Sequence, residues 1–118
     1  MSRVLIVDDE KPYRNYLSEV VALDGHEVKV AATGLEAIEV GTAMVPDVLV
    51  ADWRLPTGHS GLEVGAALKK VNPQLRVIMI TGYSAKDLRE AAEIEIAMVL
   101  EKPFDLEDVV RAVRNVLA

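Results

Sequence analysis

The sequence contains no cysteine, only two histidines and no long apolar stretch. Without cysteine, the chain cannot form disulfides, use thiol chemistry or hold a cysteine-ligated zinc ion. A membrane-spanning helix needs about 20 consecutive apolar residues, and no run here approaches that length. The first apolar run, Val4–Val7, is followed at once by two acids, so it does not resemble the core of a signal peptide. We expect a cytoplasmic protein that does not enter a membrane.

Basic residues are also scarce, because 13 Lys and Arg stand against 19 Asp and Glu, for a formal net charge of −6. Contacts to nucleic-acid phosphates need clustered basic side chains. The one adjacent basic pair, Lys69-Lys70, is better explained as a solvated helix end. Direct binding to nucleic acid is therefore not expected. A chain of 118 residues can form one compact domain and is too short for two, so we expect a single domain over residues 1–118.

Strand-like and helix-like segments alternate five times along the chain. Predicted strands cover residues 3–7, 27–31, 47–52, 75–80 and 96–100, and predicted helices cover 11–24, 34–44, 61–71, 85–93 and 106–117. Strict alternation predicts right-handed crossovers and a doubly wound α/β fold, with a parallel sheet and helices on both faces.

Local signals support several of these boundaries. Thr33, followed three residues later by Glu36, is the pattern of a capping box at a helix start. Gly25 suits a helix stop, and Asp105 suits the cap of the last helix. The fourth helix offers mostly alanine and Leu88 for burial, so we expect it to be the least firmly anchored.

Polar residues stand where four of the strand-like runs end. They are Asp8, Asp9, Asp52, Thr81 and Lys102. Because the carboxyl ends of parallel strands lie along one edge of a sheet, we expect these widely separated residues to converge.

Three clustered carboxylates repel one another, and one pair about 4 Å apart costs about 4 kcal/mol at an effective dielectric near 20. A cation can offset that repulsion. Oxygen ligands without cysteine or clustered histidine point to Mg²⁺ or Mn²⁺. Lys102 adds a fixed positive charge and Thr81 a hydroxyl donor. A nucleophilic acid, a divalent cation, an ammonium group and a hydroxyl group together indicate phosphoryl transfer.

These motifs resemble the receiver domain of two-component response regulators, of the chemotaxis-regulator type, over essentially the whole chain. The matching residues are Val7-Asp8-Asp9-Glu10 after the first strand, Asp52 after the third, Thr81-Gly82 after the fourth and Lys102-Pro103-Phe104 after the fifth. Asp-Asp alone is a weak signal, whereas the full set in this order is highly specific.

The resemblance implies a flavodoxin-like sheet in the order 2-1-3-4-5, with Asp52 as the phosphoacceptor. The phosphoryl donor would be a phosphohistidine of a sensor histidine kinase or of a histidine phosphotransfer protein. Asp9 and Asp52 would bind Mg²⁺ directly together with the main-chain carbonyl of Arg54, while Asp8 would act mainly through water.

The resemblance also implies how the signal leaves the site. Lys102 would bind a phosphoryl oxygen, and Thr81 would move toward the phosphoryl group and alter the fourth helix, fifth strand and fifth helix. Gly82 would leave room beside the entering group, and the Lys102-Pro103 peptide would be cis. Homodimers that use this same face are common in the family, so a homodimer is possible here. The output partner is unknown.

The sequence departs from the family pattern at two places. Val99 occupies the position, three residues before the lysine, where the family usually has an aromatic switch residue, so Tyr83 is the alternative candidate. The loop between Pro56 and Gly61 is one residue longer than the commonest pattern. We also expect Arg54 and Tyr83 to influence the access of water to the phosphoryl group.

Each site residue has a simpler interpretation. Asp8 and Asp9 could cap a helix, Lys102 could be a solvated lysine, and Thr81 could be only a strand-end hydroxyl. For His26 and His59 the simpler interpretation is favoured, with His26 exposed in a turn.

Other functions compete with the phosphorylated switch. A degenerate receiver would act only as a binding module, and the chain could instead be the receiver segment of a hybrid histidine kinase. A haloacid-dehalogenase-like phosphatase needs a second acid two residues after the nucleophile, where this chain has Arg54. A flavin-binding flavodoxin needs a Ser/Thr/Gly-rich phosphate loop after the first strand, which is absent. We expect no enzymatic turnover beyond self-catalysed, Mg²⁺-dependent phosphorylation and dephosphorylation.

Overall fold

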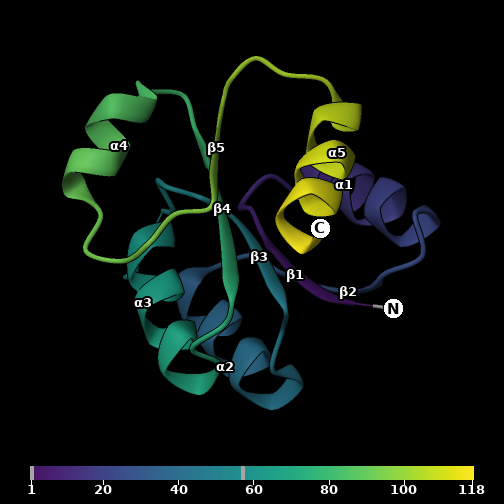
Figure 1. Cartoon of the computed structure of the whole chain (residues 1–118), viewed down its shortest axis with the longest axis horizontal. Helices are drawn as coiled ribbons and strands as arrows, with labels where there is room; N and C mark the ends of the chain where they lie inside the picture. Colours follow the sequence, from purple (N-terminus) through teal and green to yellow (C-terminus); the bar gives the residue numbers. More distant parts are fainter. Residues whose placement is uncertain (1, 57) are drawn as a thin grey trace.

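The computed structural model describes residues 2–56 and 58–118, and within them five strands and five helices alternate (Figure 1). The strands are β1 (Arg3–Val7), β2 (Glu27–Ala31), β3 (Val48–Asp52), β4 (Arg76–Thr81) and β5 (Met98–Glu101). The helices are α1 (Lys11–Leu23), α2 (Gly34–Met44), α3 (Gly61–Val71), α4 (Ala85–Ala91) and α5 (Leu106–Leu117).

The five strands form one parallel sheet in the order β2-β1-β3-β4-β5. The predicted doubly wound, flavodoxin-like α/β fold is therefore confirmed. β3 lies at the centre of the sheet, with β1 on one side and β4 on the other, so the ends of these three strands are neighbours.

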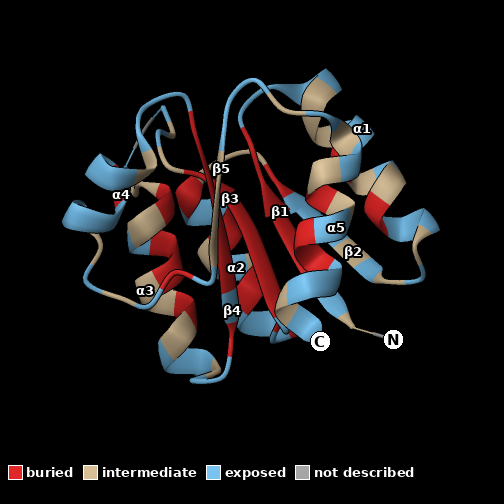
Figure 2. Cartoon of the chain, turned by 45° about the horizontal axis from the view of Figure 1, so that its top comes forward, coloured by how far each residue is buried: buried red, intermediate tan, exposed pale blue. Residues whose placement is uncertain are grey.

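The helices cover both faces of the sheet. Helices α1 and α5 pack on one face through Leu17, Val21, Val109 and Val113. Helices α2, α3 and α4 cover the other face, where Ala37, Val64, Leu68 and Leu88 are buried. Strand β3 is buried along its whole length, which explains its almost unbroken apolar sequence (Figure 2).

The start of α2 and the end of α1 differ in detail from the prediction. Thr33 caps α2 as expected by accepting a hydrogen bond from Glu36 N–H. However, the Glu36 side chain accepts from Ala32 N–H and not from Thr33 N–H, so the predicted capping box is incomplete. Helix α1 ends at Leu23, one residue early, and Gly25 adopts φ +95° in the turn that follows.

Helix α4 is shorter than predicted. It ends at Ala91, because Ala92 has an extended backbone, with φ −74° and ψ 133°. The chain then turns so that Ile94 reaches Gly65 on α3. Leu88 is the one buried residue of α4, in agreement with the expectation that this helix is weakly anchored.

Among residues 2–56 and 58–118, every helix is too short or too polar to cross a bilayer. Thr57, which belongs to the long loop before α3, lies outside the described residues, as does Met1.

Candidate functional site

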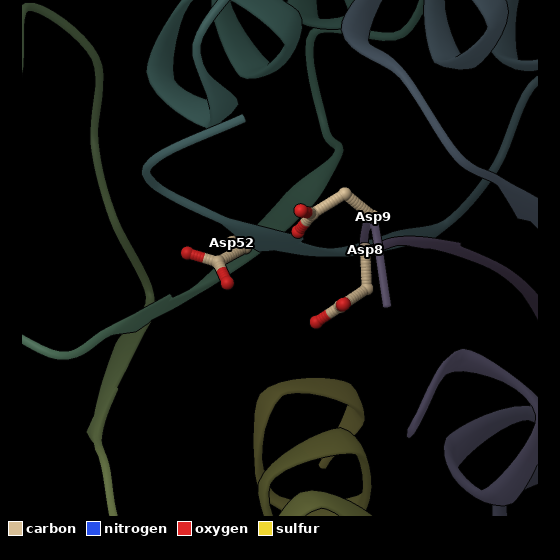
Figure 3. A group of neighbouring side chains, drawn as sticks. All are labelled: Asp8, Asp9 and Asp52. Atoms are coloured by element: carbon tan, nitrogen blue, oxygen red, sulfur yellow. The ribbon is translucent and has the colours of Figure 1, made fainter. Parts of the chain in front are cut away.

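The carboxylates of Asp8, Asp9 and Asp52 meet at the carboxyl end of the sheet (Figure 3). Asp8 and Asp9 follow β1 directly, and Asp52 is the last residue of β3. One oxygen from each of the three lies within 4.8 Å of the others. Asp9 is exposed, whereas Asp8 and Asp52 are buried. The predicted convergence of the three acids is therefore seen in the fold.

Burial places Asp8 under electrostatic strain. Its Oδ1 accepts a hydrogen bond of 2.8 Å from Glu10 N–H, while its Oδ2 is buried without a hydrogen-bond partner among the described residues. Desolvation, supported by the nearby charges of Asp52 and Asp9, raises the pKa of Asp8 to about 6. A buried carboxylate oxygen without a donor is the kind of atom that a metal ion would satisfy.

Lys102 supplies the positive charge that the sequence predicted. Its Nζ lies 2.9 Å from Asp52 Oδ2, and Arg54 N–H donates to Asp52 Oδ1 at 3.2 Å. Desolvation lowers the pKa of Lys102, but the hydrogen bond to Asp52 and the charges of Asp52 and Asp8 together outweigh it, so the pKa is raised. Lys102 is therefore a permanent cation, and the interpretation as a solvated loop lysine is not supported.

Thr81 lies next to Asp52 across the sheet. Asp52 pairs with Ile80, and Thr81 is the following residue. The Thr81 side chain is buried, and its Oγ1 accepts a hydrogen bond of 2.9 Å from Tyr83 N–H. The hydroxyl thus already holds the loop after β4, which links it physically to α4.

Gly61 fixes the helix after the acid-bearing strand. A Cβ atom on Gly61 would lie 2.2 Å from the Asp52 carbonyl oxygen, so no other residue fits without moving the backbone. Gly61 N–H also donates to Trp53 O at 2.9 Å. The start of α3 is therefore pinned against the end of β3, whatever the length of the loop between them.

Trp53, Arg54 and Tyr83 form a stack beside the acids. The Arg54 guanidinium carbon lies 4.7 Å from the centre of the Trp53 ring and 5.1 Å from that of Tyr83. The two rings are 6.2 Å apart in an edge-on arrangement. The stack connects the loop after β3 to the loop after β4. Sequence reasoning named Arg54 and Tyr83, but not their contact with each other or with Trp53, since nothing in the spacing brings residue 54 to residue 83.

Two further residues were missed by sequence reasoning. Burial, reinforced by the charges of Asp8 and Asp52, raises the pKa of Tyr13 to about 12, and the Tyr13 ring lies 6.1 Å from that of Phe104. Glu101, the last residue of β5, accepts a hydrogen bond of 3.1 Å from Ala85 N–H at the start of α4. Its place at a strand end was the available signal.

Neither histidine belongs to the cluster of Asp8, Asp9 and Asp52, and the prediction that His26 is exposed was wrong. Only 12% of the His26 side chain is accessible, with Nε2 3.6 Å from Asp24 Oδ2. Asp24 also pairs with Arg114 of α5, and this cluster covers the turn after α1. His59 Nδ1 lies 3.6 Å from Glu63, so it belongs to the start of α3.

Other expectations near the site are met or unchanged. The Lys102-Pro103 peptide is cis. A Cβ atom on Gly82 would have nothing within 4 Å, so the space beside it is open. Val99 packs partly buried against the face that α3 and α4 cover. The role of the Arg54 carbonyl remains a prediction.

Comparison with known proteins decides the family. Residues 4–114 match the family model of the response regulator receiver domain. The chain belongs to this family. Receiver domains are signalling domains of two-component systems, and they bind Mg²⁺ at an acidic pocket such as the cluster of Asp8, Asp9 and Asp52.

Individual relatives agree with this assignment. This receiver domain is 34% identical over 116 residues to "Sporulation initiation phosphotransferase F" of Bacillus subtilis, covering 98% of this chain and 93% of that protein. It is 34% identical over 115 residues to "Transcriptional regulatory protein PdtaR" of Mycobacterium tuberculosis, covering 94% of this chain and 54% of that protein. Against PdtaR, as against several other regulators, the chain spans about half of the relative's length.

Solved structures show the same fold. The chemotaxis response regulator CheY4 of Vibrio cholerae superposes with a TM-score of 0.88 at 28% identity, covering 98% of each chain. The non-phosphorylated HemR receiver domain of Leptospira biflexa gives 0.88 at 26% identity, covering 100% of this chain and 95% of that one.

The raised pKa of Asp8 predicts a pH-dependent stability in the metal-free protein. The ionised Asp8 side chain destabilises the fold at pH values above about 6, whereas the neutral form does not. The contribution of Asp8 to the free energy of unfolding is therefore highest below the pKa near 4 that Asp8 has in the unfolded chain, and it falls as the pH rises through 6. In EDTA, Asp8→Asn should raise the free energy of unfolding at pH 7.5 by on the order of 2–3 kcal/mol, since asparagine keeps the acceptor for Glu10 N–H.

Urea unfolding at pH 7.5 and pH 4.5 measures this effect. The gain should shrink strongly at pH 4.5, where the wild-type carboxyl is already protonated. Glu107→Gln, on an exposed position of α5, is the control and should show no such pH dependence. An equal gain from Asp8→Asn at both pH values would contradict the assignment.

Proposed function

We propose that the protein is a phosphorylation-dependent switch that accepts a phosphoryl group on Asp52. The observation that carries the proposal is the position of Asp52, buried at the end of β3, with Lys102 Nζ 2.9 Å from one carboxylate oxygen and two more acids beside it. Asp52 is oriented by Lys102 and Arg54 N–H, so its carboxylate is held in place for attack.

The proposed step is a transfer from a phosphohistidine of a sensor histidine kinase or a histidine phosphotransfer protein. A carboxylate oxygen of Asp52 forms a bond to phosphorus while the phosphorus–nitrogen bond breaks, and the electron pair leaves with the imidazole nitrogen. Lys102 neutralises negative charge on the phosphoryl oxygens as the group arrives. Hydrolysis of the acyl phosphate by water resets the site.

A divalent cation fits the residues that are present. Asp9 and Asp52, with the Arg54 carbonyl, would hold Mg²⁺ or Mn²⁺, and Asp8 would act mainly through a bound water. The unpartnered Oδ2 of Asp8 and the all-oxygen donor set support this proposal. When bound, the ion supplies positive charge that offsets the repulsion between the acids and the phosphoryl oxygens.

The acyl phosphate can be tested without knowing the cognate kinase. Incubation with acetyl phosphate and Mg²⁺ should add one hydroxylamine-sensitive phosphoryl group per chain, measured by intact mass spectrometry. Asp52→Asn should add none. Lys102→Ala keeps the nucleophile but loses the cation, so its rate of labelling should fall on the order of 10²-fold. Labelling that persists in Asp52→Asn would place the acceptor elsewhere and overturn the proposal.

The metal site makes a separate prediction. Mg²⁺ binds the folded state preferentially, so it should raise the melting temperature, by the equivalent of about 2.7 kcal/mol at one hundred times its Kd. Asp9→Ala removes a proposed ligand from the exposed side of the cluster and should abolish the rise. Glu107→Ala, at an exposed position of α5 outside the acid cluster, should leave the rise unchanged. An undiminished rise in Asp9→Ala would show that the ion binds at another place.

We also propose that Tyr83 takes the part of the missing aromatic at Val99. Thr81 Oγ1 now accepts from Tyr83 N–H, and its proton is free to be donated to a phosphoryl oxygen. Rotation of Thr81 toward that oxygen would weaken its bond to Tyr83 N–H and loosen the ring from Arg54. The loop between β4 and α4 would then move, and α4 would follow because Leu88 alone anchors it by burial.

Beryllofluoride with Mg²⁺ imitates the phosphoryl group and tests this coupling by NMR. In the wild type, amide shifts should extend over residues 81–104. Tyr83→Ala should reduce the shifts in α4 while those around Asp52 remain, and Tyr16→Ala, an exposed tyrosine on α1, should behave as wild type. Wild-type shifts confined to residues 52–60 would disprove coupling to α4.

A further inference from the structure

One hollow of the described surface lies at the β2 edge of the sheet, opposite the edge formed by β5. It is a groove of about 880 Å³ along the edge strand β2. Val28, Lys29 and Val30 form its floor, Ser18 and Ala22 of α1 form one wall, and Val40 and Ala43 of α2 form the other. Its lining is mostly apolar, and it contains none of the residues proposed for phosphoryl transfer.

The floor of the groove carries unused backbone hydrogen-bonding groups. Glu27 N–H donates to Ser2 O, and Ala31 O accepts from Asp8 N–H, so these two residues face β1. Because successive residues of a strand face opposite sides, Val28 and Val30 turn their N–H and C=O groups away from β1, into the groove. β2 has no neighbour on that side. The edge can therefore bind one further strand.

The walls restrict what can reach this edge. β2 is the edge strand of the sheet, with α1 and α2 on its opposite faces (Figures 1 and 2). Residues of all three elements line the groove, and three of the five residues of β2 are exposed. A second copy of the chain would bring its own Glu19 and Glu39 towards the same two acids, so like charges would repel, whereas an extended segment with basic side chains would be attracted.

The charged side chains that line the groove favour a basic peptide segment. Glu19 stands on the α1 wall and Glu39 on the α2 wall, and both are exposed. Neighbouring side chains of an extended peptide point to opposite faces, so two adjacent basic residues would meet these two acids. Lys29 is the one basic residue in the lining, against two acids.

We propose that this groove binds an extended segment of a partner protein by strand addition to β2, with adjacent Lys or Arg residues flanked by β-branched residues. Main-chain hydrogen bonds to Val28 and Val30 supply affinity, and the two acids supply the preference for basic segments. The site does not depend on phosphorylation of Asp52, so its test is independent of the proposed function.

The probe is a capped hexapeptide, Thr-Val-Lys-Lys-Val-Thr, titrated into labelled protein and followed by NMR. Shifts should concentrate in residues 15–22, 28–30 and 39–43, and affinity should fall with added salt. The same peptide with two glutamates should bind about tenfold more weakly or worse. A peptide N-methylated at alternate amides should lose binding, because strand addition needs those donors.

Variants of the chain separate strand addition from loose attraction. Val30→Pro removes an outward N–H at an edge position that tolerates proline, and Ala43→Trp fills the groove without touching β2 hydrogen bonds. Each should abolish binding at unchanged melting temperature. Glu19→Gln with Glu39→Gln should weaken it about tenfold, while Glu107→Gln should not.

Three outcomes would overturn the proposal. The first is absence of shifts at millimolar peptide, or shifts outside the groove. The second is equal binding of the lysine and glutamate peptides. The third is a wild-type dimer in sedimentation that Ala43→Trp dissociates, which would make a second copy the occupant. If Val30→Pro does not fold, Ala43→Trp and the N-methylated peptide decide the matter.

Discussion

The organisation of this protein depends on the balance between crowded negative charge and one fixed positive charge. Asp8, Asp9 and Asp52 offer oxygens within 4.8 Å of one another, and among residues 2–56 and 58–118 the Lys102 ammonium, 2.9 Å from Asp52, is the cation paired with them. Burial and the repulsion between these acids disfavour the ionised form of Asp8, and its pKa is raised for that reason. A site with surplus negative charge accepts a cation readily. Under the proposed function, a bound cation would also offset the charge of an incoming phosphoryl group.

The parallel sheet explains how so costly a cluster is maintained. β3 is buried along its whole length between β1 and β4, so the backbone that carries Asp52 has no freedom to relieve the repulsion. Gly61 pins the next helix against the Asp52 carbonyl, which holds the same backbone from the other side. The rigid parts of the molecule therefore carry the acids. The loop after β4 and helix α4 have little buried surface, so under the proposed function they are the segments that would move on phosphorylation.

Much of the fold and site could be predicted from sequence, because both depend on local patterns. Apolar runs that end in polar residues predicted four of the five strands, and the topology of alternating elements then brought Asp8, Asp9 and Asp52 together. What failed depends on tertiary contacts. The length of α4 is set by Ile94 reaching Gly65. The burial of His26 accompanies its contact with Asp24, which is itself paired with Arg114 of α5. The Arg54 stack and the β2 groove likewise arise only when distant segments meet.

The stack beside the acids contains the one tryptophan of the chain, Trp53. Its indole follows β3 directly and lies against both the Arg54 guanidinium and the Tyr83 ring. Any rearrangement of those two partners changes the polarity around a single fluorophore. The protein thus carries a built-in optical reporter beside its acid cluster, with no second indole in the sequence to obscure the emission.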